Sequence, residues 1–186
     1  MNRILYQTLE DRHNIDFVRK YGPFKCSRRS AFLGDGYYFW DTNINHAHSW
    51  GKSSYNGSYI IGKIEVPYDT SKVFDLTDPY YLQDLKDAEE RLREAYKFKK
   101  RICVRFIIDW LKEDRIFLKR FVAIRASDAK IQMNSNNKLF FYDGRSEYLN
   151  MSPRVQICYF SNDSFKSLPF TIVYPDKYLD STQFAV

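Results

Sequence analysis

The segment FLGDGYYFWDTNINHAHSWGK, residues Phe32 to Lys52, carries the strongest structural signals in the chain. Its glycines, Gly34 and Gly36, permit a positive backbone φ angle or a close approach of the backbone, and they predict a loop. The aromatic run from Tyr37 to Trp40 follows directly. Such a run is typical of a β-strand, because aromatic side chains fit a pleated, half-buried surface.

A short helix is expected after this strand. Asp41 or Thr42 can provide the N-cap of a helix that starts near Asn43, because short polar side chains bind the free amides of a first helical turn. Ala47 and Trp50 would then lie on neighbouring turns of one helix face. The quoted segment thus predicts a loop, a strand and a short helix in succession.

Apolar and β-branched runs predict further strands on both sides of this segment. They begin at Arg3, Ser58, Val73, Phe121, Lys138, Arg154 and Phe170. Between the third and fourth runs, Asp78 and Pro79 suit the N-cap and first position of a helix, and apolar residues at helical spacing in 102–111 predict a second helix. We expect a single α+β domain over 1–186, with an antiparallel core of one sheet or two and a helical hairpin inserted at about 78–119.

Composition and charge are those of a globular protein. The chain has 186 residues, of which 44% are hydrophobic, and a formal net charge of +6, which can steer an anionic ligand or a nucleic acid toward its surface. The three cysteines form no CxxC pair, which favours reduced thiols. No apolar run has the length of a signal peptide or a membrane span. We therefore expect a cytoplasmic protein with no membrane partner.

The sequence lacks the common fingerprints of several catalytic folds. GxGxxG, GxxxxGK[ST], HExxH and GxSxG do not occur, which argues against a classical dinucleotide fold, a P-loop, a zincin and an esterase. His46 and His48 are two residues apart. Residues at this spacing point in different directions on a helix, so the pair does not predict a metal site.

Three motifs, taken in order, resemble the ADP-ribosyltransferase superfamily: LYQT near the start, LGDGYYF followed by AHSW, and VQICYFSN near the end. The likeness is to the branch shared by poly(ADP-ribose) polymerase catalytic domains and many small bacterial toxins. That branch commonly shows Gly-x-Gly-x-Tyr-Phe and then an Ala-x-x-aromatic pattern. The corresponding residues here are Gly34, Gly36, Tyr38, Phe39, Ala47 and Trp50. The resemblance covers about the first 65 residues and the tail from about Gln156.

The resemblance implies that NAD is cleaved between nicotinamide and ribose and that ADP-ribose is transferred to a macromolecular acceptor, protein or nucleic acid. It also implies a toxin of a toxin-antitoxin or antiphage system, with an antitoxin protein as partner. Three alternatives stay open. They are a binding module of the same fold without catalysis, an NAD hydrolase and an RNA 2′-phosphotransferase-like enzyme.

The first family motif usually reads His-Gly-Thr after an aromatic residue, and this chain has Tyr6, Gln7 and Thr8 there. By the resemblance, Gln7 replaces the histidine and binds a ribose hydroxyl, since an amide both donates and accepts hydrogen bonds. Thr8 is a second candidate for that contact, and Tyr6 would belong to the NAD pocket. Gln7 and Thr8 can equally be ordinary strand residues.

The second motif implies the nicotinamide pocket. Tyr38 falls on the family's stacking tyrosine, and an aromatic face suits a flat nicotinamide ring. Gly36 and Trp50 would also belong to the NAD pocket. Arg28 and Arg29 precede the glycine loop and can meet the pyrophosphate, because guanidinium forks suit phosphate oxygens. A solvated basic loop is the alternative for the two arginines.

The last motif is normally a glutamate, and sometimes a glutamine in toxin-like members. Gln156 lies in the strand-like VQICYF and is favoured by that context, whereas Glu147 is the carboxylate alternative in DGRSEYL. A carboxylate would stabilise the positive charge that develops on the ribose. An amide could only orient the ribose hydroxyl and the acceptor.

Overall fold

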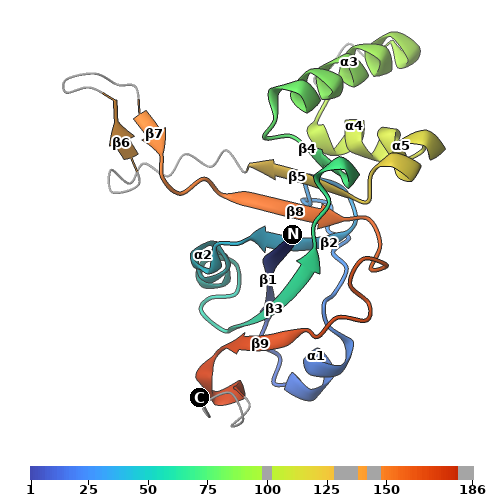
Figure 1. The fold of residues 1–186 in the computed structure, drawn as a ribbon. Coiled ribbons are helices and arrows are strands. Elements are labelled where there is room, and N and C mark those ends of the chain that lie inside the picture. Colours follow the sequence, from blue (N-terminus) through green and yellow to red (C-terminus); the bar gives the residue numbers. More distant parts are fainter. Residues whose placement is uncertain (98–101, 128–137, 142–147, 180–186) are drawn as a thin grey trace.

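The computed structural model describes residues 1–97, 102–127, 138–141 and 148–179 (Figure 1). Seven strands form one sheet in the order β4-β5-β8-β2-β1-β3-β9. Their bounds are β1 Asn2–Glu10, β2 Tyr37–Asp41, β3 Tyr59–Pro67, β4 Val73–Asp75, β5 Ala123–Ser127, β8 Val155–Tyr159 and β9 Thr171–Tyr174. The remaining two, β6 (Lys138–Phe140) and β7 (Tyr148–Asn150), pair with each other and lie apart from the sheet in Figure 1.

Five α-helices accompany the sheet in the described ranges. They are α1 Ile15–Tyr21, α2 Ile44–Ser54, α3 Pro79–Tyr96, α4 Val104–Leu111 and α5 Arg115–Arg120. Short 3₁₀ turns, η1 and η3, occupy Thr70–Lys72 and Asp176–Tyr178. Figure 1 shows α3, α4 and α5 gathered at the end of the sheet that holds β4 and β5, whereas α2 lies near β1 and β3.

The α+β class is confirmed, but the prediction of an antiparallel core is wrong for one pair of strands. β4 and β5 run parallel, so the sheet is mixed. Parallel neighbours need a long crossover connection, usually helical, and the segment with α3, α4 and α5 provides it. The hairpin predicted at 78–119 is therefore a group of three helices, in which Asp114 caps α5 by accepting a hydrogen bond from the Ile116 amide at 2.7 Å.

Two capping predictions have different outcomes. Asp78 caps α3 with Pro79 in the first turn, as predicted. Asn43 caps α2 instead of Asp41 or Thr42, because its side chain accepts a hydrogen bond from the Asn45 amide at 3.0 Å. The Asp41 carboxylate is bound to arginines, as described below, and is not available for the helix amides.

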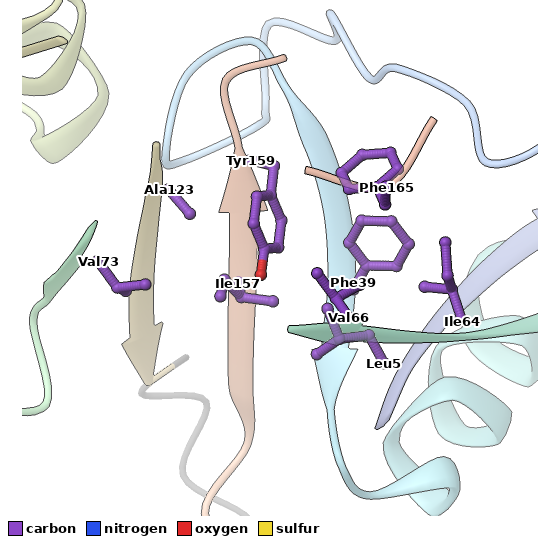
Figure 2. Packing of buried hydrophobic residues seen from close by; sticks show 9 residues of the cluster. All are labelled: Leu5, Phe39, Ile64, Val66, Val73, Ala123, Ile157, Tyr159 and Phe165. Atoms are coloured by element: carbon purple, nitrogen blue, oxygen red, sulfur yellow. The ribbon is translucent and has the colours of Figure 1, made fainter. Parts of the chain in front are cut away.

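The side chains of successive residues in β2 lie on opposite faces of the sheet. On one face, Phe39, Tyr159 and Phe165 meet edge to face with ring centroids 5.4 to 6.2 Å apart. Figure 2 shows their cluster, which consists of Leu5, Phe39, Ile64, Val66, Val73, Ala123, Ile157, Tyr159 and Phe165. Tyr37 packs against this cluster, whereas Tyr38 packs against the cluster on the other face. The two tyrosines therefore lie on opposite faces of the sheet, as the alternation of side chains along a strand requires.

β1 and β2 touch over a short length only. β1 follows β3 through nine paired positions, from Asn2 to Glu10, but its recorded pairs with β2 are Leu5 with Asp41 and Tyr6 with Trp40. Beyond these pairs the two strands diverge toward the glycine loop. The sheet is therefore continuous at one end of the junction between β1 and β2 and open at the other.

An ion-pair network fixes the closed end of this junction. The buried Asp41 carboxylate lies 2.6 Å from Arg3 Nε and 2.7 Å from Arg125 Nε, and Arg125 also reaches Asp75 at 2.9 Å. These residues come from β1, β2, β4 and β5. Because a buried carboxylate is stable only when it is paired, the network holds the four strands in register.

We expect Asp41→Asn to lower the free energy of unfolding by about 3 kcal/mol, because it leaves two partly buried arginines without their shared partner. Urea unfolding of the purified variant measures this loss. Asp163→Asn makes the same chemical change at an exposed ion pair with Lys166 and should leave the stability nearly unchanged. Equal effects of the two substitutions would contradict the role given to Asp41.

Candidate functional site

A cleft opens where β1 and β2 diverge. Its volume is about 960 Å³, which is at the upper end of the range of ligand sites. The residues that line it are Gln7, Thr8, Leu9, Phe24, Lys25, Cys26, Ser27, Arg28, Ser30, Ala31, Phe32, Tyr38, Phe39, Trp40, Trp50, Ser54, Tyr55 and Gln156. Six of these are residues predicted from the sequence: Gln7, Thr8, Arg28, Tyr38, Trp50 and Gln156. They come from β1, the segment between α1 and β2, β2 itself, α2 and β8.

Gln7 spans the open end of the junction. Its buried amide nitrogen donates hydrogen bonds to the carbonyls of Phe24 at 2.8 Å and Tyr38 at 3.2 Å, and its oxygen accepts one from the Phe24 amide at 2.7 Å. An amide has two N–H donors and two acceptor positions. Both donors are therefore occupied by the backbone, and one acceptor position of the Gln7 oxygen is left for a ligand hydroxyl.

Tyr38 supports the glycine loop with its hydroxyl group. The phenol accepts a hydrogen bond from the Leu33 amide at 2.9 Å and donates one to the Gly34 carbonyl at 2.8 Å. Burial raises the pKa of this phenol, so the group stays neutral. With the hydroxyl occupied, the ring is the part of Tyr38 that can contact a ligand.

Helix α4 holds the same loop from the other side. Arg105 donates to the carbonyls of Arg28 at 2.6 Å and Ala31 at 3.3 Å, and its second nitrogen bonds the Asp35 carboxylate at 2.8 Å. Lys112 donates to the carbonyls of Leu33 at 3.3 Å and Asp35 at 3.1 Å. The helical insertion thus fixes the backbone that carries one wall of the cleft.

Neither Gly34 nor Gly36, the two glycines of the loop before β2, leaves room for a side chain. Gly34 has a φ of +77°, and a Cβ there would lie 2.5 Å from an Asp109 carboxylate oxygen. Gly36 pairs through its backbone with Cys26, and a Cβ there would meet the Cys158 sulfur and lie 2.5 Å from the Tyr159 carbonyl oxygen. Gly36 therefore does not line the cleft but allows β8 to approach the loop.

The wall formed by α2 is aromatic. Thr8 ties β1 to this helix by donating a hydrogen bond to the Ala47 carbonyl at 3.0 Å. The rings of Trp40 and Trp50 lie 6.1 Å apart, and both line the cleft. Tyr6 packs behind them against the cluster that contains Trp40 and Ala47 and does not line the cleft.

Gln156 reaches the cleft from β8, where its neighbours across the ladder are Trp40 and Ala126. Its side chain is half-buried and makes no hydrogen bond with any other residue that the structure describes. It is therefore a polar group available to a ligand. Glu147, the alternative for the last motif, lies outside the described residues.

The charged groups of the cleft wall are cationic. Among the described residues that line it, Lys25 and Arg28 are charged and there is no carboxylate. The Arg28 guanidinium lies 5.7 Å from the centroid of the Tyr55 ring and 3.4 Å from its hydroxyl. Arg29 is exposed beside Arg28 but does not line the cleft. An anionic or electron-rich ligand suits such a surface.

The two histidines of α2 have separate partners. His46 Nε2 lies 3.1 Å from the Pro153 carbonyl, whereas His48 Nδ1 lies 2.9 Å from the Tyr59 hydroxyl. Within 1–97, 102–127, 138–141 and 148–179, no group of three or more His, Cys, Asp or Glu side chains is arranged to hold a metal ion.

Several residues of the wall were not predicted from the sequence. Trp40 could have been found, because it lies two positions from Tyr38 on the same strand and so shares its face. Tyr55 is the C-cap of α2, five positions after Trp50, and this spacing does not place it on the same helix face, so the pattern does not mark it. No local signal marks Phe24, which is brought to the cleft by the Gln7 amide across 17 residues of chain.

Comparison of the chain with family models, with curated proteins and with solved structures gave no match. In the portion of the chain that the structure describes, no helix has both the length and the apolar character needed to cross a membrane.

The hydroxyl of Tyr38 provides a first test of the site. Tyr38→Phe should lower the free energy of unfolding by about 1 to 2 kcal/mol, since it leaves the Leu33 amide without a partner. Hydrogen exchange should show faster exchange of that amide. Tyr37→Phe is the matched control, because Tyr37 faces Phe165 and its hydroxyl makes no hydrogen bond among the described residues. An equally slow Leu33 amide in both variants would exclude this role of Tyr38.

The thiol of Cys158, against Gly36, provides a second test. Burial raises its pKa from 9.0 to about 12, so above pH 9 the thiol ionises in the unfolded chain before it does so in the folded protein. The folded state then binds more protons, and its stability falls as the pH rises toward 12. The stability advantage of the wild type over Cys158→Ala should shrink by about 2 kcal/mol between pH 8 and pH 10.5.

Urea unfolding at the two pH values measures this difference. Cys103→Ala is the control, because Cys103 is exposed in the folded protein and its thiol meets water in both states. A wild-type advantage over Cys158→Ala that stays constant with pH would show that the thiol ionises equally in the folded and unfolded chains.

Proposed function

We propose that this protein is an ADP-ribosyltransferase that takes NAD as its substrate. One observation carries the proposal: six residues that the family resemblance assigned to NAD binding or catalysis, from five separate parts of the chain, line one cleft. Five of the six lie within the first 50 residues, whereas Gln156 comes from β8, far away in the sequence, and has no local reason to meet them. Their convergence supports the resemblance on which the assignment rests.

The chemistry of the wall fits the parts of NAD. Tyr38, Trp40 and Trp50 offer aromatic faces, which suit the nicotinamide and adenine rings. Lys25 and Arg28 offer positive charge and hydrogen-bond donors, which suit a pyrophosphate. The absence of a carboxylate among the described lining residues removes a source of repulsion for the two phosphates.

In the proposed reaction the bond between the nicotinamide nitrogen and ribose C1′ breaks, and its electron pair leaves with nicotinamide. Positive charge develops on the ribose, an acceptor nucleophile adds to C1′, and the nucleophile loses its proton. Gln156 would orient the ribose hydroxyl and the acceptor through its free amide. Gln7 would act mainly by holding Phe24 and Tyr38 at the cleft, with one acceptor position open to a ribose hydroxyl.

The biological setting belongs to the same proposal. We place the enzyme in the cytoplasm, as a toxin of a toxin-antitoxin or antiphage system that an antitoxin protein restrains. This part rests on the resemblance to small bacterial toxins alone.

A binding module without catalysis is the second candidate, and the cleft itself favours it in one respect. The described lining residues include no carboxylate to stabilise the ribose cation, and both N–H groups of Gln7 are bound to backbone carbonyls. A protein with these features could hold NAD without cleaving it.

Incubation of the purified protein with NAD labelled in the adenosine part separates the candidates. We expect label on a macromolecule, which identifies transfer. Free labelled ADP-ribose without labelled macromolecule would identify a hydrolase. Intact NAD that is nevertheless bound, as measured by calorimetry, would identify the binding module.

Gln156→Ala should lower NAD turnover by about a hundredfold, the effect typical of removing one oriented polar group from a reacting centre. Glu147→Gln should leave turnover nearly unchanged if Gln156 forms the last motif. Steady-state release of nicotinamide measures both, and circular dichroism checks the fold. A large loss in Glu147→Gln with an active Gln156→Ala would reverse the assignment of these two residues.

A further inference from the structure

We propose that the acceptor of the ADP-ribose is a single-stranded nucleic acid, which lies on the surface of α1 and enters the cleft beside Phe24. The proposal rests on the proposed function and specifies its acceptor. It follows from three aromatic rings that continue the cleft wall outward and from four exposed cations on α1 and along the segment that lines the cleft.

The three rings, of Phe17, Tyr21 and Phe24, form what we name the α1 platform. Phe24 lines the cleft. Phe17 stacks on Phe24 with ring centroids 5.6 Å apart and an interplanar angle of 8°, and Tyr21 lies 4.8 Å from Phe17. The side chains of Phe17 and Tyr21 are 51% and 55% exposed. The stack therefore starts inside the cleft and ends in water.

Exposed rings in such a series need a reason, because burying them would stabilise the protein. Aromatic faces beside a cationic surface are how proteins bind single strands, since every base can stack on a ring while the cations follow the phosphates. An unstacked base lying on Phe24 would stand at the cleft wall, near the Gln7 amide that binds the backbone of Phe24.

The charge on α1 and on the segment that follows it fits a polyanion. Lys20, Lys25, Arg28 and Arg29 are exposed, and none of them makes an ion pair with a carboxylate among the described residues. Lys20 lies 5.2 Å from the centroid of the Tyr21 ring. The acidic residue of α1, Asp16, is balanced by Arg19 at 3.5 Å. Helix α1 and the following segment up to Arg29 thus carry an excess of positive charge.

The chemistry of transfer is compatible with this acceptor. A base nitrogen or a phosphate oxygen of the strand would add to ribose C1′ as nicotinamide leaves with the electron pair of the broken bond. A base N–H would release its proton to water, and a phosphate oxygen anion would have none to release. Neither needs an oxidant, and a phosphate oxygen needs no general base, which suits a cleft wall without a described carboxylate.

The test first measures binding without NAD, so that it does not depend on turnover. Fluorescent oligouridylate and oligothymidylate of about twelve nucleotides, within the range of known single-strand sites, are titrated with the full chain, and anisotropy gives the Kd. We expect both to bind, with affinity that falls as salt rises, by a slope of about 0.7 per phosphate contacted. The ratio of the two Kd values shows whether RNA or DNA is preferred.

Substitutions on the platform should weaken this binding. Phe17→Ala and Tyr21→Ala should each raise the Kd about tenfold, which lies within the effect of removing one stacking ring. Lys20→Glu should raise the Kd and reduce the salt slope. Tyr80→Ala and Lys86→Glu are matched controls, because both residues are exposed on α3, and they should leave the Kd unchanged.

Thermal unfolding of each variant shows whether it is still folded. If Phe17→Ala or Tyr21→Ala unfolds, Lys20→Glu decides the question, because this exposed lysine is not part of the core. Failure of the wild type to bind either oligonucleotide, a Kd unaffected by the α1 substitutions, or an equal loss in the α3 controls would overturn the proposal.

Labelled NAD then tests the transfer itself. Label on the oligonucleotide, lost in Lys20→Glu while this variant still binds NAD like the wild type in calorimetry, would support the proposal. Label on an added protein with none on the oligonucleotide would overturn the proposal of a nucleic-acid acceptor, while the proposed transferase activity would stand. Intact NAD in the presence of a bound oligonucleotide would overturn the transferase, and with it the acceptor role, while the binding surface would stand.

Discussion

The structure depends on how β1 and β2 are held together at one end and apart at the other. Asp41, bound between Arg3 and Arg125, closes one end of the junction. At the other end the Gln7 side chain replaces a backbone ladder by binding Phe24 and Tyr38. A sheet that paired fully along β1 and β2 would have no cleft. The candidate site therefore lies where the pairing of β1 with β2 stops, and the Gln7 side chain makes the hydrogen bonds there.

Single residues of this site both support its structure and line the cleft, and they use different groups for the two roles. Tyr38 uses its hydroxyl to hold the glycine loop and presents its ring to the cleft. Arg28 offers its carbonyl to Arg105 and its guanidinium to the cleft mouth. Substitution of such a residue removes both functions together, so conservative changes such as Tyr38→Phe are needed to separate them.

The sequence predicted what depends on short-range patterns. The glycine loop, the aromatic strand at Tyr37 and the cap at Asp78 follow from local chemistry, and they are found in the structure. What it missed depends on distant partners. Arg105 binds Asp35 across 70 residues. The parallel pairing of β4 with β5 depends on the long connection that contains α3, α4 and α5. Asn43 was missed as a cap because Asp41 is recruited by arginines from other strands. The family roles of the cleft residues remain a proposal.

The position of β8 has a consequence for the order in which the chain is made. This strand lies between β2 and β5, both of which precede it in the chain. Until β8 leaves the ribosome, the two halves of the sheet have unpaired edges facing one another, and the wall that carries Gln156 is missing. A prematurely terminated chain is therefore left without a finished cleft.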